Sequence, residues 1–279
     1  MGFSDRLSNG WTIAVNSLKV LKANKQLIIF PVLSGISMML IIGSLVVVAF
    51  ANSDWQVDIN SYYGNIAAYA MVLAFYIVNY FVVVFFNTAL VHCVSLYFKG
   101  EAVDIKAGLQ FSVSRIGAIF SWAVFAGTIG AAIKILQDNL GSIGKIITAL
   151  IGIVWGVATF FVVPIIAHEN LGPIDAFKRS VALMREKWGQ SVGAGFSFGL
   201  IQLGFIILAG IPVVLLWMVN PIAGILSGVI LLAIMFAVFS AARTVFITAV
   251  YLNVTGDPVE NYEQHFIDNL FVEKKSRLF

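Results

Sequence analysis

Charged residues are scarce in this sequence. Only 11% of the 279 residues are Asp, Glu, Lys or Arg, whereas 60% are hydrophobic. Soluble globular domains carry about 25% charged residues, because polar side chains must cover their surface. The shortage of charge therefore excludes a soluble globular protein and indicates an integral membrane protein.

The usual sequence signatures of catalysis and cofactor binding are also missing. Cys93 is the one cysteine, which excludes an intrachain disulfide and a multi-cysteine metal cage. His168-Glu169 has no second His four residues on, and no Gly-rich phosphate loop or Rossmann motif follows a strand. We therefore expect no metal, no cofactor and no enzyme. The net charge of +3 does not indicate nucleic acid as a partner.

The sequence does contain long apolar stretches. A helix needs about 20 such residues to cross the roughly 30 Å of bilayer hydrocarbon. Six segments are long enough: 27–51, 66–86, 116–136, 146–167, 192–219 and 221–241. Only Asn220-Pro221 joins the last two, which predicts a tight helical hairpin. The predicted fold class is all-α, a polytopic membrane helical bundle with six transmembrane helices.

The basic residues predict the orientation of this bundle. Of the 17 Lys and Arg residues, all but Lys134 and Lys145 lie at the same side of the expected spans. The positive-inside rule then places both termini in the cytoplasm, as expected for a multi-pass protein of the cell inner membrane. An alternative is that the first span is a signal peptide, because Ala49-Phe50-Ala51 resembles a cleavage site. Its apolar run is long for a signal peptide, which favours the span.

Three cytoplasmic segments have the spacing of amphipathic interfacial helices: 4–24, 103–115 and 173–188. The clearest stripe contains Ile174, Phe177, Val181, Met184 and Trp188, with Lys178, Arg179, Arg185 and Glu186 away from it. Such helices lie in the headgroup plane. We expect a six-span domain over 1–255 and a cytoplasmic amphipathic tail over 256–279. This tail is acidic before it is basic, and we expect it to pack on the protein's own cytoplasmic face; docking a partner is the alternative.

Each expected interfacial helix precedes two spans, and the exits after the second, fourth and sixth spans look alike. Gly100, Gly172 and Gly256 stand where helices commonly end on a left-handed residue. One interpretation is a threefold internal repeat of an interfacial helix plus a hairpin. The other is that any six-span protein with short loops has this layout.

Glycine pairs four residues apart recur in or next to the spans, at 152/156, 189/193, 195/199 and 224/228. Small residues at this spacing let helix backbones approach closely in lipid. We expect these pairs to pack helices within the chain; a homo-oligomer interface is the alternative.

Polar residues inside the spans are few. No Asp or Glu lies in the middle of a span, and the polar exceptions are Asn79 and Gln202. Because ion-coupled transport usually uses an intramembrane carboxylate, that mechanism is disfavoured. Asn79 and Gln202 are expected to form interhelical hydrogen bonds; lining a transport path is the alternative.

A second polar group lies at the cytoplasmic ends of the spans. Its members are Asn87, His92, His168, Glu169 and Arg243. One hypothesis is a headgroup or anion site in which Arg243 holds the anion and a histidine tunes it with pH. The other, which we favour, is a structural ion pair between Arg243 and Glu169.

Several segments resemble a known family. They are 17–25, 27–31, 85–90, and Ala249-Val250-Tyr251 with Gly256. They look like an uncharacterised family of bacterial six-span membrane proteins, a domain of unknown function. The layout is also similar to the membrane domain beside some glycerophosphodiester phosphodiesterases, whose catalytic barrel is absent here. The resemblance implies the six-span topology and assigns no activity.

These patterns are compatible with three functions, which we give in order of preference. The first is a non-enzymatic inner-membrane protein that organises membrane lipids or partner proteins at the cytoplasmic leaflet. The second is a facilitative transporter or channel for a small solute or lipid, and the third is a membrane enzyme. A continuous polar cavity between spans distinguishes a transporter from a solidly packed scaffold.

Overall fold

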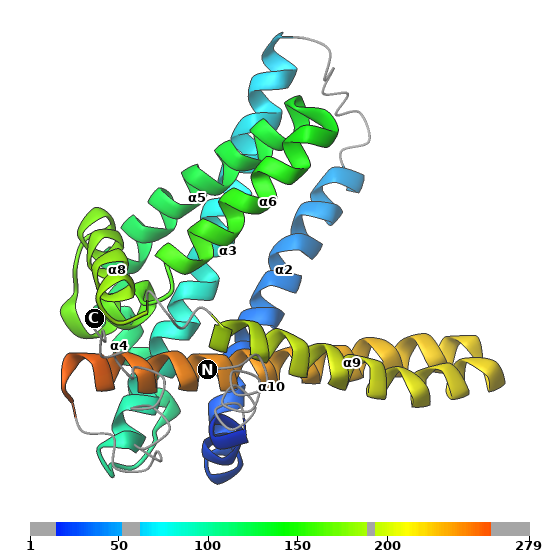
Figure 1. Cartoon of the computed structure of the whole chain (residues 1–279). Helices are drawn as coiled ribbons and strands as arrows, with labels where there is room; N and C mark the ends of the chain where they lie inside the picture. Colours follow the sequence, from blue (N-terminus) through cyan, green and yellow to red (C-terminus); the bar gives the residue numbers. More distant parts are fainter. Residues whose placement is uncertain (1–14, 52–61, 189–192, 258–279) are drawn as a thin grey trace, which may run out of the picture. The chain divides into compact units, whose positions relative to one another are not determined.

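The computed structural model describes residues 15–51, 62–188 and 193–257, which are mostly helical and contain no strand (Figure 1). A helix over 15–23 precedes a 3-10 turn, η1 (Lys25–Ile28). The helices that follow are α2 (Ile29–Ala51), α3 (Tyr62–Phe98), α4 (Ile105–Ser114), α5 (Ile116–Asn139), α6 (Gly141–Ala158), α7 (Val162–Glu169), α8 (Pro173–Trp188), α9 (Gly193–Val219) and α10 (Pro221–Thr255). The predicted all-α class is confirmed.

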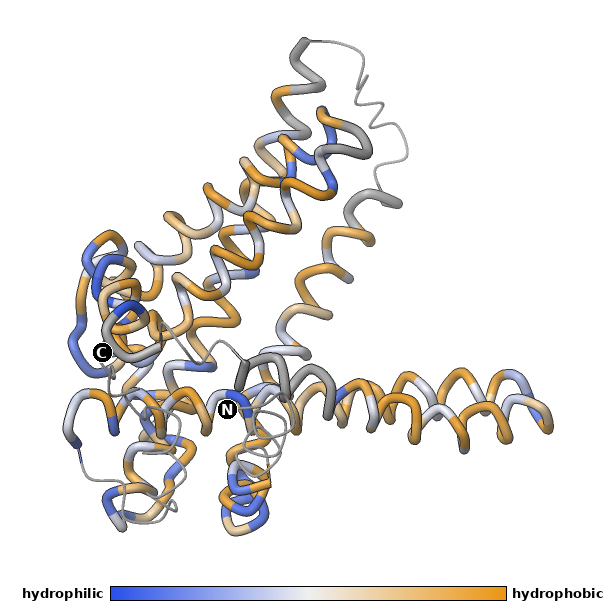
Figure 2. The backbone as a smooth tube through the Cα atoms, viewed as in Figure 1, coloured by the Kyte–Doolittle hydropathy of each residue, from blue (hydrophilic) through white to orange (hydrophobic). Residues whose placement is uncertain are grey.

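Six helical segments of the described chain are long and apolar enough to cross a membrane. Figure 2 shows the long helices coloured as predominantly hydrophobic. The fourth segment combines α6 and α7, which are separated by a short break. The six expected spans are therefore confirmed, and the chain is a multi-pass membrane protein.

Two of the expected span ends were wrong. The sequence predicts ends of the second and sixth spans at Phe86 and Ala241, but α3 continues to Phe98 and α10 to Thr255. The physical reason is that no glycine or proline interrupts either sequence before Gly100 and Gly256. Most residues of both extensions are also buried, so tertiary packing stabilises them as helix.

The chain forms two compact units. The first unit contains Met1–Ile29, Cys93–Ile105 and Leu183–Phe279, and the second contains Phe30–His92 and Lys106–Ala182. In the first unit, α9 packs along α10. In the second unit, α5 packs along α6.

Many of the buried side chains lie at the C-terminal ends of α3, α7 and α10. They include Leu90 and Phe98 of α3, Ile165 and Ile166 of α7, and Tyr251 and Leu252 of α10. In contrast, α2, α6 and α9 expose many large apolar side chains. In a bilayer, lipid chains cover such surfaces, so the exposed parts are the ones suited to cross the hydrocarbon.

The three exits after these helices share one backbone feature. Gly100 has φ 74°, Asn170 has φ 51° and Gly256 has φ 85°, and these are the left-handed residues in the described ranges. The left-handed residue expected at Gly172 is Asn170 instead, so the prediction of Gly172 was wrong. Because α7 ends at Glu169, the left-handed position falls on Asn170, and Asn tolerates that conformation better than most residues.

The element order is thus a short helix followed by two long segments, three times over. Each copy ends on a left-handed residue. This order agrees with the threefold repeat, which stays a prediction.

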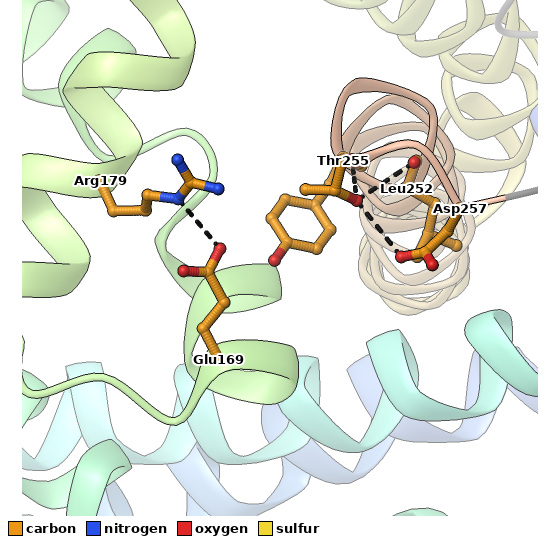
Figure 3. A network of polar contacts seen from close by, with 6 residues as sticks. Glu169, Arg179, Leu252, Thr255 and Asp257 are labelled. Carbon is orange, nitrogen blue, oxygen red and sulfur yellow. Dashed lines mark hydrogen bonds and ion pairs between the residues drawn. The ribbon is translucent and has the colours of Figure 1, made fainter.

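The expected α9–α10 hairpin is confirmed. Asn220 lies between the two helices, and its side-chain oxygen accepts hydrogen bonds from the backbone N–H of Ile222 (3.0 Å) and Ala223 (3.2 Å). Pro221 occupies the first helical position, where its missing N–H costs nothing. At the other end of α10, the Thr255 hydroxyl lies 3.3 Å from Asp257 Oδ2 (Figure 3).

Candidate functional site

Helix α4 lies against the C-terminal part of α3 in the second unit. Gly108 and Ser112, four residues apart, are the buried residues of α4. The Ser112 hydroxyl donates a hydrogen bond of 2.9 Å to the Phe85 carbonyl of α3. The small side chains permit close approach, and the hydrogen bond holds α4 in register with α3.

In this register the Phe111 ring contacts both His92 of α3 and Arg115, which follows α4. The His92 ring stacks on the Phe111 ring, with centroids 4.0 Å apart and planes 5° apart. The Arg115 guanidinium carbon lies 5.3 Å from the Phe111 centroid. We call His92, Phe111 and Arg115 the Phe111 cluster.

Arg115 is the least satisfied member of this cluster. Its Nε atom is buried and has no hydrogen-bond partner, and no ion pair of Arg115 occurs in the described part of the chain. Arg115 also stands at the N-cap of α5, where no side chain caps the helix. A partly buried cation without a counter-charge is costly, so this position is suited to an anion.

The turn between α7 and α8 carries a second polar arrangement (Figure 3). Arg179 Nε donates to Glu169 Oε1 over 3.2 Å. The buried Ser180 hydroxyl oxygen accepts a hydrogen bond of 3.1 Å from the Phe161 backbone N–H. These contacts hold the start of α8 on α7.

The residues of helix α8 differ in burial, and the predicted apolar stripe is not the buried face, because Ile174 is 55% exposed. Ala176, Ser180, Leu183 and Met184 are buried, and they recur at helical spacing. Lys178, Arg179 and Arg185 are exposed. The half-buried Phe177 contacts Trp155 of α6, with ring centroids 5.6 Å apart.

Four of the five residues in the expected cytoplasmic cluster belong to the second unit. Asn87 and His92 lie on α3, and His168 and Glu169 end α7; His168 is exposed and Asn87 is half-buried. Arg243 is an exposed residue of α10 in the first unit. The expected Arg243–Glu169 pair would join different units and stays a prediction, whereas Glu169 pairs with Arg179.

The two polar residues expected inside the spans differ in their surroundings. Asn79 Nδ2 lies 4.0 Å from Met38 Sδ of α2, a weak interhelical hydrogen bond. Gln202 is half-buried on α9. The interhelical role expected for Asn79 agrees with this contact, and the role of Gln202 stays a prediction.

The glycine pairs differ in whether another helix packs against them. A Cβ added to Gly228 would lie 3.1 Å from Val213 Cγ1, and one added to Gly224 would collide with Trp217, so this pair packs α10 on α9 as expected. Around Gly152 and Gly156 a Cβ would meet nothing within 4 Å, so the packing prediction was wrong there. The side chains at 189, 193, 195 and 199 lie outside the described residues.

Sequence reasoning missed the roles of Arg115 and Arg179. In the sequence, Arg115 contributes only to the count of basic residues. The signal that could have identified it is its spacing of four from Phe111, because residues four apart are neighbours on a helix. The contact with His92 could not be foreseen, because it depends on the register between α3 and α4. Cys93 is buried, and its thiol lies 3.3 Å from the Asp104 carbonyl oxygen.

The sequence model of a family of unknown function, DUF6159, matches residues 66–258, which is more than half of the chain. The chain belongs to DUF6159. The match begins within α3 and extends just past the end of α10, so it contains both the Phe111 cluster and the α7–α8 turn. No curated protein and no solved structure matches this DUF6159 chain.

Proposed function

We propose that the chain is a non-enzymatic protein of the inner membrane, with both termini in the cytoplasm, that organises lipids or partner proteins at the cytoplasmic leaflet. Membrane lipids are its first partners; a protein partner or a second copy of the chain is a further one, and nucleic acid is not expected. The bacterial origin and the likeness to glycerophosphodiester phosphodiesterase membrane domains remain expectations from the resemblance.

The observation that carries this proposal is that α8 buries one side and exposes, on the other, basic residues together with the apolar Ile174. Its buried face has Ala176, Leu183 and Met184, and its exposed residues include Lys178 and Arg185. A helix of this kind lies at the headgroup level, and anionic lipid attracts each basic residue near the surface by about 1 kcal/mol. The basic residues of α8 therefore enrich anionic lipid, or an acidic partner surface, around the protein.

Native mass spectrometry of the full chain, extracted gently from its own membranes, tests this proposal. We expect the wild type to retain anionic phospholipid or a stoichiometric protein partner. The double variant Lys178→Gln/Arg185→Gln should retain several-fold less, because it removes the charges that attract them.

The matched control is Lys134→Gln/Lys145→Gln, which removes the same charge from the expected outer side. This control should retain as much as the wild type. Equal retention by all three proteins, or equal loss in both variants, would contradict the proposal.

The alternative function is a facilitative transporter or channel. Gln202, half-buried in an otherwise apolar helix, is the observation that favours it. Solute flux through proteoliposomes that Gln202→Leu abolishes would favour this alternative over the scaffold.

A further inference from the structure

We infer that the Phe111 cluster binds the phosphate of one phospholipid from the cytoplasmic leaflet, with Arg115 as the phosphate ligand. The inference rests on the proposed function in one respect, that the start of α5 lies at this leaflet. It adds a defined site with its own residues, separate from the basic face of α8.

The first support is the state of the Arg115 guanidinium. Its Nε atom is covered by protein and has no hydrogen-bond partner, and Phe111 lies beneath the guanidinium at 5.3 Å. This leaves the terminal nitrogens as the groups available to an anion. A guanidinium presents parallel N–H donors that match two phosphate oxygens, and the bound anion offsets the cost of burying the cation.

The second support is the rigidity of the platform under Arg115. The His92 ring stacks on Phe111 at 4.0 Å, and Ser112 bonds to the Phe85 carbonyl between the same two helices. An arginine held over a fixed ring loses less side-chain freedom on binding than an arginine on an open surface.

The third support is the backbone at the start of α5. Arg115 is the N-cap of this 24-residue helix, and no side chain accepts from its first N–H groups. Gly117, in the first turn, is exposed with open space around it. Unsatisfied N–H groups and the helix dipole at such a terminus favour a negative group.

A phospholipid rather than a free anion is indicated by the surface that follows. Ile116 is 47% exposed and Phe120 is 55% exposed, and their spacing of four places them on one side of α5. Phe81 of α3 lies against Phe120, with ring centroids 6.3 Å apart. An anion held at Arg115 thus lies directly before an exposed apolar surface, as the phosphate of a lipid lies before its acyl chains.

The test is a titration of the delipidated full chain in detergent with phosphatidylglycerol, followed by native mass spectrometry. We expect Arg115→Gln to weaken binding of the first lipid by about tenfold, the loss of one charge-assisted hydrogen-bond pair. Lys99→Gln, which removes an equal charge from an exposed cytoplasmic position, should bind like the wild type. Equal affinity of the wild type and Arg115→Gln would overturn the inference.

Two further measurements use the wild-type chain and so do not depend on how a variant folds. A phosphatidylglycerol with a photoreactive acyl chain should crosslink to the peptide that contains Ile116 and Phe120; crosslinks confined to other helices would overturn the site. Inorganic phosphate in large excess should leave the first lipid bound. Its displacement by phosphate would identify a free-anion site and overturn the lipid assignment, as would an acidic protein retained through Arg115 in place of lipid.

The outcome is separable from that of the proposed function. Lys178→Gln/Arg185→Gln should keep the single lipid at Arg115 while losing the general enrichment. If the protein binds this lipid but neither the wild type nor any variant enriches anionic lipid or a partner protein, the scaffold function is contradicted and the lipid site at Arg115 is still supported.

Discussion

Arg179 Nε lies 3.2 Å from Glu169 Oε1, and this contact joins α8 to the end of α7 across the left-handed turn at Asn170. The side chain of Arg179 is 43% exposed and that of Glu169 is 27% exposed. Water therefore screens the pair, and its contribution to stability is modest, at most about 1 kcal/mol.

A pair of double-mutant cycles distinguishes the observed partner of Glu169 from the one expected from sequence. We expect Glu169→Ala and Arg179→Ala to show a coupling free energy of about 0.5 kcal/mol in chemical unfolding of the detergent-solubilised protein. Arg243→Ala combined with Glu169→Ala tests the second pairing. Additive losses in that second cycle would mean that Arg243 and Glu169 do not touch, and additivity in the first would contradict the observed pair.

The backbone at Asn170 gives a second prediction. Asn170→Gly should be neutral or slightly stabilising, whereas Asn170→Val should destabilise the protein by about 1–2 kcal/mol, because a branched side chain is strained at φ 51°. Thermal unfolding of the two variants measures the difference. Gly172→Ala is the control: open space surrounds Gly172, so it should behave like the wild type. A larger loss at 172 than at 170 would restore the position expected from sequence.

The glycines of the second unit give a third prediction. A Cβ added to Gly127 would lie 2.8 Å from the Ile77 backbone nitrogen, so Gly127→Ala forces α5 and α3 apart. We expect a loss of about 1–3 kcal/mol, as for an overpacked core. Gly156→Ala, whose added methyl meets open space, should be neutral or stabilising, because Ala favours helix. Equal effects of the two variants in thermal unfolding would refute the α3–α5 contact.

Labelling of intact cells with a membrane-impermeant thiol reagent tests the topology. Asp58→Cys and Lys145→Cys should react from outside, and Lys178→Cys should react only after the cells are opened, because the basic residues mark the cytoplasmic side. The buried native Cys93 should contribute little background. The reverse labelling pattern would invert the orientation.

The helical class and the six spans followed from composition and length alone, because backbone groups in lipid must be satisfied inside each segment. The Asn220-Pro221 hairpin followed from turn chemistry. The ends of α3 and α10 did not, because packing extends a helix beyond the point where its apolar run meets polar residues such as Asn87 and Arg243. The packing of Gly224 could be predicted from its spacing, but the same spacing failed for Gly152 and Gly156.

Local chemistry is what the sequence by itself determined: which segments are apolar enough to cross a bilayer, and where the basic residues concentrate. Tertiary structure alone decided which side chains meet. Glu169 forms an ion pair with Arg179, Asn170 adopts the left-handed conformation, and His92 stacks on Phe111, which also contacts Arg115. The reason is that propensity and hydropathy act over a few neighbouring residues, whereas these contacts depend on the register in which separate helices pack.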